Sequence, residues 1–299
     1  MLRFPATFGH NSFAFNEHLD SAGAVVLANV HATVTIDERE ANTAFRDLRD
    51  PYHLTTGGAL GRSHKNFTSI RLGGRIQAPD ASQAASLSDK ERALLAAFDP
   101  ALCYRDSPTT EGAYAFDFTE RTTDTTTYPT GLIALRYYCR PAEKPRIREA
   151  IAEFGSKPYA LSLIAGDPRC YEQTEQTLSL TPAAASGNVV NRGTVPAPLR
   201  ATITMAGAGN AAFTITRAGV AFILNLAGMV ASDVVVVTFE TCGPYGEGKI
   251  ITKNGTRNFA LKTSSPSTWL DVPVGTTSFA ISNHTNVTSC VLAWRSARA

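Results

Sequence analysis

Apolar and polar residues alternate with a period of two through most of this 299-residue chain, and this alternation constrains the fold more than any other feature. Successive side chains of a β-strand point to opposite faces, so the pattern predicts strands that bury one face. The clearest such segments are YAFDF (114–118), YALSLIA (159–165), FTITR (213–217), VVVVTFE (234–240) and SCVLAWR (289–295). The sequence therefore predicts a mainly β protein.

Two polar segments between predicted strands indicate turns. Asn254-Gly255 favours a type I′ hairpin, because both central residues of that turn need a positive φ. The threonine-rich stretch ERTTDTTTYPT (120–130) lacks the apolar residues of a core, so we expect an exposed hairpin or loop there.

Only two segments have the apolar spacing of a helix. The first, SLSDKERALLAAFDP (86–100), has Ser88 as its expected N-cap and Glu91 as the second member of a capping box. The second, AEKPRIREAIAEFG (142–155), has Pro145 in its first turn, where the missing N–H costs nothing. Each helix has one apolar face, and we expect each to pack on a sheet.

The domain boundary is expected where Pro and Gly cluster, in TPAAASGNVVNRGTVPAP. That stretch shows no helix or strand pattern, both predicted helices precede it, and only strands are predicted after it. We therefore expect an N-terminal domain over 1–180, a linker over 181–198 and a C-terminal β-sandwich over 199–299.

Charge and apolar content exclude two classes of protein. The chain has 28 Lys and Arg, 26 Asp and Glu, and no basic run, which argues against binding to nucleic acid. The most apolar stretch, AGVAFILNLAGMVASDVVVV (218–237), is interrupted by polar residues such as Asp233. We interpret it as two buried strands joined by a turn near 229–233, and expect no membrane span.

The cysteines and histidines show no metal or disulfide pattern. The five cysteines have irregular spacings, which indicates small buried side chains in a reducing compartment. The six histidines are scattered, so we expect no metal site.

No segment carries a convincing catalytic motif. GGALGRS (57–63) is glycine-rich but lacks the terminal Gly-Lys-Ser/Thr of a phosphate loop, and we interpret it as a turn before the strand NFTSIRL. Asp37 and Glu38 are neighbours on a predicted strand and would point to opposite faces. Asp117 lies on the polar face of its strand, where solvated surface is the expectation. We expect no catalytic residue and no cofactor.

The two tryptophans receive different interpretations. Trp294 shares the apolar face of the last strand and is expected in the core. Leu270, Val272 and Val274 alternate with Trp269 in the sequence, so we expect Trp269 on the face opposite to theirs. A tryptophan side chain usually packs in a core or lies in an interface with another protein. A contact to a glycan or a partner protein is the alternative for Trp269, because sugars stack on exposed aromatic faces.

The order of these signals resembles the distal tail protein family of long-tailed (siphovirus-type) bacteriophages. The strand KNFTSIRLGGRI leads into the first helix, and YALSLIAGDPRCYEQT contains the family's strand that ends in Asp-Pro. NRGTVPAPLRATITMAGAGNAAFTI is similar to the joint that opens the family's second domain. WLDVPVGTTSFAISN and SCVLAWR are similar to its closing turn and strand. The likeness covers the chain from about residue 60 onward.

The resemblance implies a fold, partners and a location. The fold would be a β-sandwich or barrel-like ring domain with one or two helices, followed by a galectin-like β-sandwich. The protein would be a non-enzymatic virion component of the tail tip or baseplate, assembled in the host cytoplasm. It would form a hexameric ring that connects the tail tube protein to the tail-tip hub protein and can carry receptor-binding proteins. DNA would pass through that ring without sequence-specific binding.

Two other functions compete with this one. A carbohydrate-binding tail module would attach to host surface glycans through the C-terminal sandwich. A polysaccharide-degrading enzyme would need paired carboxylates, and the sequence shows none in a recognisable arrangement.

Overall fold

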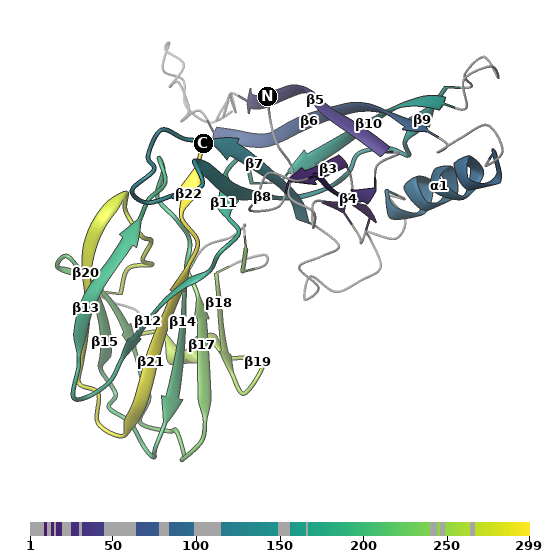
Figure 1. Cartoon of the computed structure of the whole chain (residues 1–299). Helices are drawn as coiled ribbons and strands as arrows, with labels where there is room; N and C mark the ends of the chain where they lie inside the picture. The colour runs from purple at the N-terminus through teal and green to yellow at the C-terminus, as the bar shows by residue number, and fades with distance from the viewer. Residues whose placement is uncertain are drawn as a thin grey trace, which may run out of the picture. The chain divides into compact units, whose positions relative to one another are not determined.

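The computed structural model divides into two compact units, Met1–Pro168 and Arg169–Ala299 (Figure 1). The structure describes residues 9–10, 13–14, 16–19, 25–29, 32–44, 64–77, 84–98, 115–148, 156–165, 167–239, 244–245, 249–263 and 267–299. Most of them lie in antiparallel strands, so the predicted mainly β fold class is confirmed.

The first unit is built on one large antiparallel sheet. Its strands run in the order β5, β6, β10, β8 and β7, and β9 pairs with β10. Two small two-stranded sheets, β1 with β2 and β3 with β4, accompany it. The bounds are β1 (Gly9–His10), β2 (Phe13–Ala14), β3 (Asn16–Leu19), β4 (Val25–Asn29), β5 (Ala32–Ala44), β6 (His64–Gln77), β7 (Ala115–Arg121), β8 (Leu132–Pro141), β9 (Arg146–Ile147) and β10 (Ser156–Ala165).

Alternation produces the core of this sheet as predicted. Leu161 pairs with Leu72 and Leu163 with Ile70 across β10 and β6, and all four side chains are buried. Because facing residues of paired strands share one face, each pair adds a contiguous apolar patch to that face.

One helix, α1 (Ala84–Ala97), confirms the first helix prediction. Its apolar side includes the fully buried Leu94. Ser88 lies inside the helix with an exposed side chain, so the predicted N-cap is wrong. Glu91 accepts a hydrogen bond from Lys157 of β10 at 2.7 Å, which ties the helix to the sheet in place of the predicted capping box.

The second helix prediction is wrong at its start. Arg146 and Ile147 form β9 and pair with Ala160 and Tyr159 of β10. Pairing with the edge of an existing strand outweighs the weak local preference that the apolar spacing expressed. Residues 149–155 of the predicted helix lie outside the described residues.

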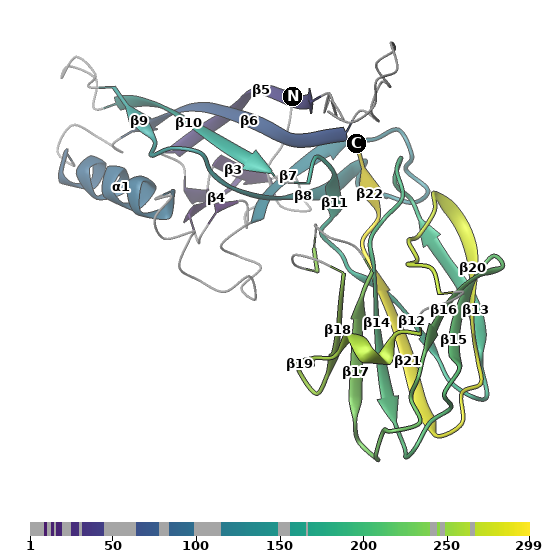
Figure 2. The ribbon, with the colours of Figure 1, turned by 180° about the vertical axis from the view of Figure 1, so that it is seen from behind.

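The second unit is a sandwich of two antiparallel sheets (Figure 1). One has the order β12-β21-β14-β17-β18-β19 and the other β13-β20-β15-β16, and β11 pairs with β22. The bounds are β11 (Cys170–Glu172), β12 (Gln176–Leu180), β13 (Ser186–Asn191), β14 (Leu199–Met205), β15 (Phe213–Arg217), β16 (Val220–Leu224), β17 (Val234–Thr238), β18 (Ile250–Lys253), β19 (Thr256–Arg257), β20 (Gly275–Ser282), β21 (Val287–Trp294) and β22 (Ala297–Arg298). The short 3₁₀-helix η4 (Phe259–Leu261) contacts β18 and is visible in Figure 2.

The stretch expected to be a linker contains a strand. β13 pairs with β20 over six residues, although the sequence indicated no strand within 181–198. Its outward positions are Ser186, Asn188 and the half-exposed Val190, so its pattern is polar enough to be mistaken for a loop. Residues 169–180 and 181–198 both belong to the second compact unit.

The predicted turns are confirmed. Asn254 and Gly255 have φ values of 49° and 80° and join β18 to β19, as a type I′ turn requires. Residues 122–131 connect β7 to β8 and are largely exposed. The apolar stretch 218–237 holds the two strands β16 and β17. No helix among the described residues is long and apolar enough to cross a membrane.

Asp233 stabilises the turn that leads into β17. Its carboxylate accepts hydrogen bonds from Lys253 Nζ at 2.8 Å, the Val230 N–H at 2.8 Å and Asn254 Nδ2 at 2.7 Å. These donors, Lys253 foremost, lower the pKa of Asp233 from 3.8 to about 2. The ionised form is therefore the one that the fold prefers.

We expect Asp233 to contribute stability above about pH 4 and to lose that contribution as the pH falls toward 2, because its pKa is lower in the folded chain than in the unfolded chain. At pH 6, the Asp233→Asn variant should unfold at a lower denaturant concentration than the unmodified chain. At pH 2, the two chains should have similar midpoints. Both tryptophans lie in the second unit, so their fluorescence reports its unfolding. An equal gap between the two chains at both pH values would contradict the assignment.

Candidate functional site

The described residues contain no group of three or more His, Cys, Asp or Glu that could hold a metal ion. GGALGRS (57–63) lies outside the described residues. Asp37 and Glu38 lie on β5, where the register with β6 shifts between Ile36 and Glu38, which marks a β-bulge.

Asp117 is not the solvated carboxylate that the sequence predicted. It is buried at 7% exposure and lies directly opposite Arg136 in the β7–β8 pair. Arg136 donates to both of its carboxylate oxygens, from Nε at 2.6 Å and from a terminal nitrogen at 2.9 Å. Both faces of β7 are covered at this point, since Phe116 and Phe118 are also buried. A carboxylate held by a bidentate arginine is a structural anion and not a free base.

The side chain of Asn191 joins four backbone segments at the start of the sandwich. Its Nδ2 donates to the carbonyl oxygens of Val195 at 2.8 Å and Val272 at 3.0 Å. Its Oδ1 accepts from the N–H groups of Gly193 at 3.0 Å and Ala297 at 3.3 Å. The residue is 1% exposed, and these four bonds use both donors and both lone pairs of the amide. Asn191 therefore fixes the joint that the sequence singled out.

Gly193 is required by the same joint. The N–H groups of Thr194 and Val195 donate to the carbonyl oxygen of Ala297 at 2.9 and 3.2 Å. This pairing brings the backbone of Ala297 so close that a Cβ on Gly193 would overlap it. Only glycine permits such an approach, which explains the Asn-x-Gly spacing in physical terms.

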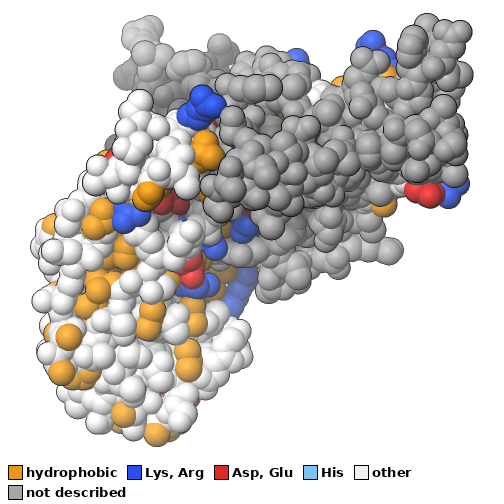
Figure 3. All heavy atoms as spheres, viewed as in Figure 1, with side chains coloured by type: hydrophobic (Ala, Val, Ile, Leu, Met, Phe, Trp, Pro, Cys, Tyr) orange, Lys and Arg blue, Asp and Glu red, His pale blue; other side chains and the backbone are white. Residues whose placement is uncertain are grey.

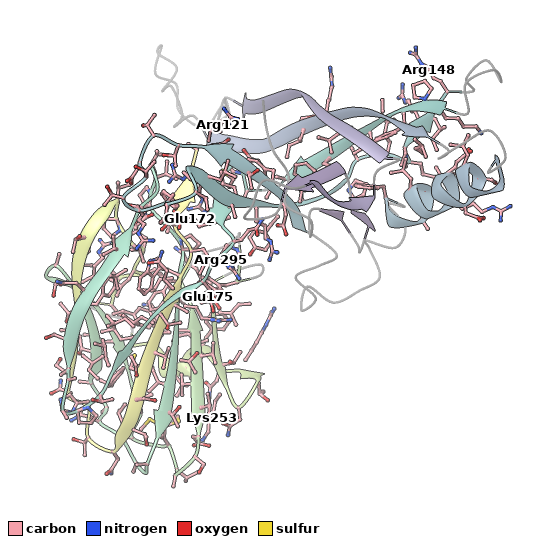
Figure 4. All side chains as sticks on the ribbon, in the orientation of Figure 1. Arg121, Arg148, Glu172, Glu175, Lys253 and Arg295 are labelled. Carbon is pink, nitrogen blue, oxygen red and sulfur yellow. The ribbon has the colours of Figure 1, made fainter. Side chains whose placement is uncertain are left out.

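A cluster of compensated charges lies at one end of the second unit. Figure 4 shows Glu172, Glu175 and Arg295 gathered there. Arg200 pairs with Glu175 at 3.2 Å, and Arg298 lies 3.7 Å from the Glu172 carboxylate. Arg295 donates to the backbone carbonyls of residues 172 and 173. Each of the two carboxylates lies beside an arginine, so neither glutamate of the cluster is an unpaired acid.

Tyr245 lies beside this cluster. The guanidinium carbon of Arg200 is 4.7 Å from the centre of its ring, within the range of a cation–π contact. Burial, reinforced by the nearby charge of Glu175, raises the pKa of the Tyr245 hydroxyl. The hydroxyl therefore stays protonated at neutral pH.

The two tryptophans pack at different places in the sandwich. Trp294 is buried, and its Nε1–H donates to the carbonyl oxygen of Val190 at 3.0 Å, which links β21 of one sheet to β13 of the other. The core prediction for Trp294 is confirmed. Trp269 is half-buried, with its ring centre 5.1 Å from that of Phe222 and 6.0 Å from that of Phe239. It covers the edge beside β16 and β17.

Trp269 also contacts two lysines. Lys249 Nζ lies 5.7 Å and Lys262 Nζ 5.9 Å from its ring centre. The sequence predicted an outward-facing Trp269 but gave no sign of these cations, because Lys249 and Lys262 belong to different segments.

An open groove with a volume of about 810 Å³ lies on the first unit. Its walls come from β6, β10 and the segment around β9, and an ion pair between Glu143 and Arg146 at 2.8 Å borders it. The lining residues are Ser69, Arg71, Leu72, Glu143, Arg146, Ala160, Leu161 and Ser162. The groove is polar and shallow, and it holds no nucleophile paired with a base.

No protein-family model and no curated protein matches the sequence. Among solved structures, the SPP1 Dit (gp 19.1) protein aligns with 88% of this chain and 93% of its own, at a TM-score of 0.50 and 11% sequence identity. The chain has the fold of the SPP1 Dit protein. That protein is described as a paradigm of the hub adsorption apparatus in phages that infect Gram-positive bacteria.

Two structures of the phage P2 baseplate in its activated conformation, with Ca and with Sr, each align with 92% of this chain and 94% of theirs. Their TM-scores are 0.40 and 0.38, with identities of 8% and 7%.

We expect Asn191→Ala to destabilise the second unit by about 2–4 kcal/mol, because it leaves buried backbone donors and acceptors without partners. The measurement is chemical denaturation followed by tryptophan fluorescence. Asn188→Ala, an exposed position on the same strand, should change stability by less than about 0.5 kcal/mol. Equal effects of the two replacements would show that the Asn191 network does not hold the joint.

Proposed function

We propose that this chain is a structural component of the distal tail of a bacteriophage, at the tail tip or baseplate. The observation that carries the proposal is the extent of the likeness to the SPP1 Dit protein, which spans 88% of the chain and includes both units. Similarity of a single sandwich would say little, because such sandwiches carry many unrelated functions.

We further propose that copies of the chain form a closed ring, which the family resemblance gives as hexameric. A ring subunit uses two different surfaces that meet head to tail, and this needs no catalytic residue. The sheet of the first unit supplies a candidate contact, because β5 is its last strand within the described part of the chain and pairs there only with β6. A neighbouring subunit can pair with a strand edge of this kind.

The partners follow from the same proposal. The ring would join the tail tube protein to the tail-tip hub protein, and it can also hold receptor-binding proteins. It would be part of the virion, assembled in the host cytoplasm, and would let DNA pass without sequence-specific contacts. The carboxylates of Asp117, Glu172 and Glu175 each lie beside an arginine, and these three pairs support a non-enzymatic role.

Negative-stain electron microscopy of the purified chain, alone and mixed with the tube and hub proteins of the same virion, tests this proposal. We expect annular particles with six-fold class averages, and light scattering should give a mass of six subunits. A chain that stays monomeric at high concentration and with both partners would contradict the ring.

A further inference from the structure

The sandwich of the second unit has an uneven distribution of charge. Residues 272–294 contain no Asp, Glu, Lys or Arg, and residues 201–232 contain only Arg217. In the face shown in Figure 3, the charged side chains of this unit gather toward one end and one edge, and the rest of the surface is uncharged. By contrast, KIITKNGTRNFALK (249–262) has four basic residues and no acidic one.

Three of these four cations have no carboxylate partner within the described part of the chain. Lys253 pairs with Asp233 at 2.8 Å, and Figure 4 shows it at the opposite end of the unit from Glu172 and Arg295. Lys249 and Arg257 are exposed and Lys262 is half-buried. The positive charge of these described cations attracts anions to this edge.

The same edge presents aromatic surface. Trp269 keeps part of its ring exposed, while Phe222 and Phe239 hold it from behind. Phe259 of η4, which lies between Arg257 and Lys262 in the chain, is 51% exposed. A large aromatic side chain at this exposure offers an apolar face to a ligand and loses little conformational freedom on binding.

Lys262 is held in position beside the ring. Its Nζ donates to the carbonyl oxygens of Ser267 at 3.0 Å and Thr263 at 3.3 Å, so the ammonium group near Trp269 is fixed. The exposed Lys249 places a second ammonium group at a similar distance from the same ring. Two ammonium groups within 6 Å of one ring centre concentrate positive charge there, and this charge attracts an anion.

We propose that the edge formed by Lys249, Arg257, Lys262 and Trp269 binds an anionic sugar polymer. An acidic group of the polymer pairs with the two lysines, and the apolar side of a sugar ring contacts the exposed part of Trp269. The site is independent of the proposed ring, because all its residues come from one unit of one chain.

A sugar polymer fits this edge better than nucleic acid or an acidic protein segment does. Binding to nucleic acid relies on many phosphate contacts along a basic track, whereas this edge has only three cations without a carboxylate partner among the described residues. An acidic peptide would bind through charge alone and would not need the tryptophan.

The test uses the purified full chain and four probes in isothermal titration calorimetry at low salt. Polygalacturonate carries both sugar rings and carboxylates, and its fully methyl-esterified form keeps the rings without the charge. Polyphosphate carries charge without rings, and a single-stranded DNA oligonucleotide represents nucleic acid. We expect binding to polygalacturonate and at least tenfold weaker binding to each of the other three.

Matched variants assign the binding to this edge. Lys249→Gln should weaken the binding of polygalacturonate about tenfold, as expected for loss of one charged hydrogen bond. Lys253→Gln removes the same charge at the other end of β18, where Lys253 pairs with Asp233, and should leave the affinity within twofold. Trp269→Leu should also weaken binding about tenfold. Should that variant fail to fold, the exposed Lys249 still decides the question.

Three results would overturn the proposal. The first is the absence of polygalacturonate binding. The second is equal binding of polyphosphate or DNA, which would indicate unspecific attraction of anions. The third is an equal effect of Lys249→Gln and Lys253→Gln. None of these results depends on whether the chain forms a ring.

Discussion

The four hydrogen bonds of the Asn191 side chain are the interaction on which the second unit depends. They fix the end of β13, the loop after it, the segment before β20 and the C-terminal strand β22 relative to one another. Trp294 bonds to the residue just before Asn191, and Gly193 lets β22 approach just after it. A buried amide whose donors and acceptors all have partners stabilises the fold. Loss of one partner leaves a buried polar group without a hydrogen bond, and the full desolvation free energy of that group then opposes folding.

Local alternation predicted the strands whose inward positions are strongly apolar, and the sandwich core contains examples. Phe213, Ile215, Val235 and Val237 all lie inward as their spacing indicated. β13 was missed because most of its outward positions are Ser or Asn and one of its two buried side chains is the Asn191 amide. A strand that buries a hydrogen-bonded polar side chain has no apolar signature in the sequence.

The candidate sites depended on contacts between distant segments, which local patterns do not encode. Asp117 looked solvated because its strand alternates, but the β8 register places Arg136 opposite it and both faces of β7 are covered. The start of the predicted second helix became β9 because the edge of β10 was available for pairing. The alternation of apolar residues predicted that Trp269 faces outward. The two lysines beside its ring belong to other segments and are brought to it only by folding.

We propose different tasks for the two units. The β5 edge of the first sheet would serve assembly, and the basic aromatic edge of the sandwich would bind an anionic polymer. In this proposal the chain is a building block of the virion tail. The decisive measurement is cross-linking mass spectrometry of purified, washed virions. We expect cross-links between copies of this chain and between the chain and the tube and hub proteins. Virions that are infectious and contain no peptide of this chain would contradict the proposal.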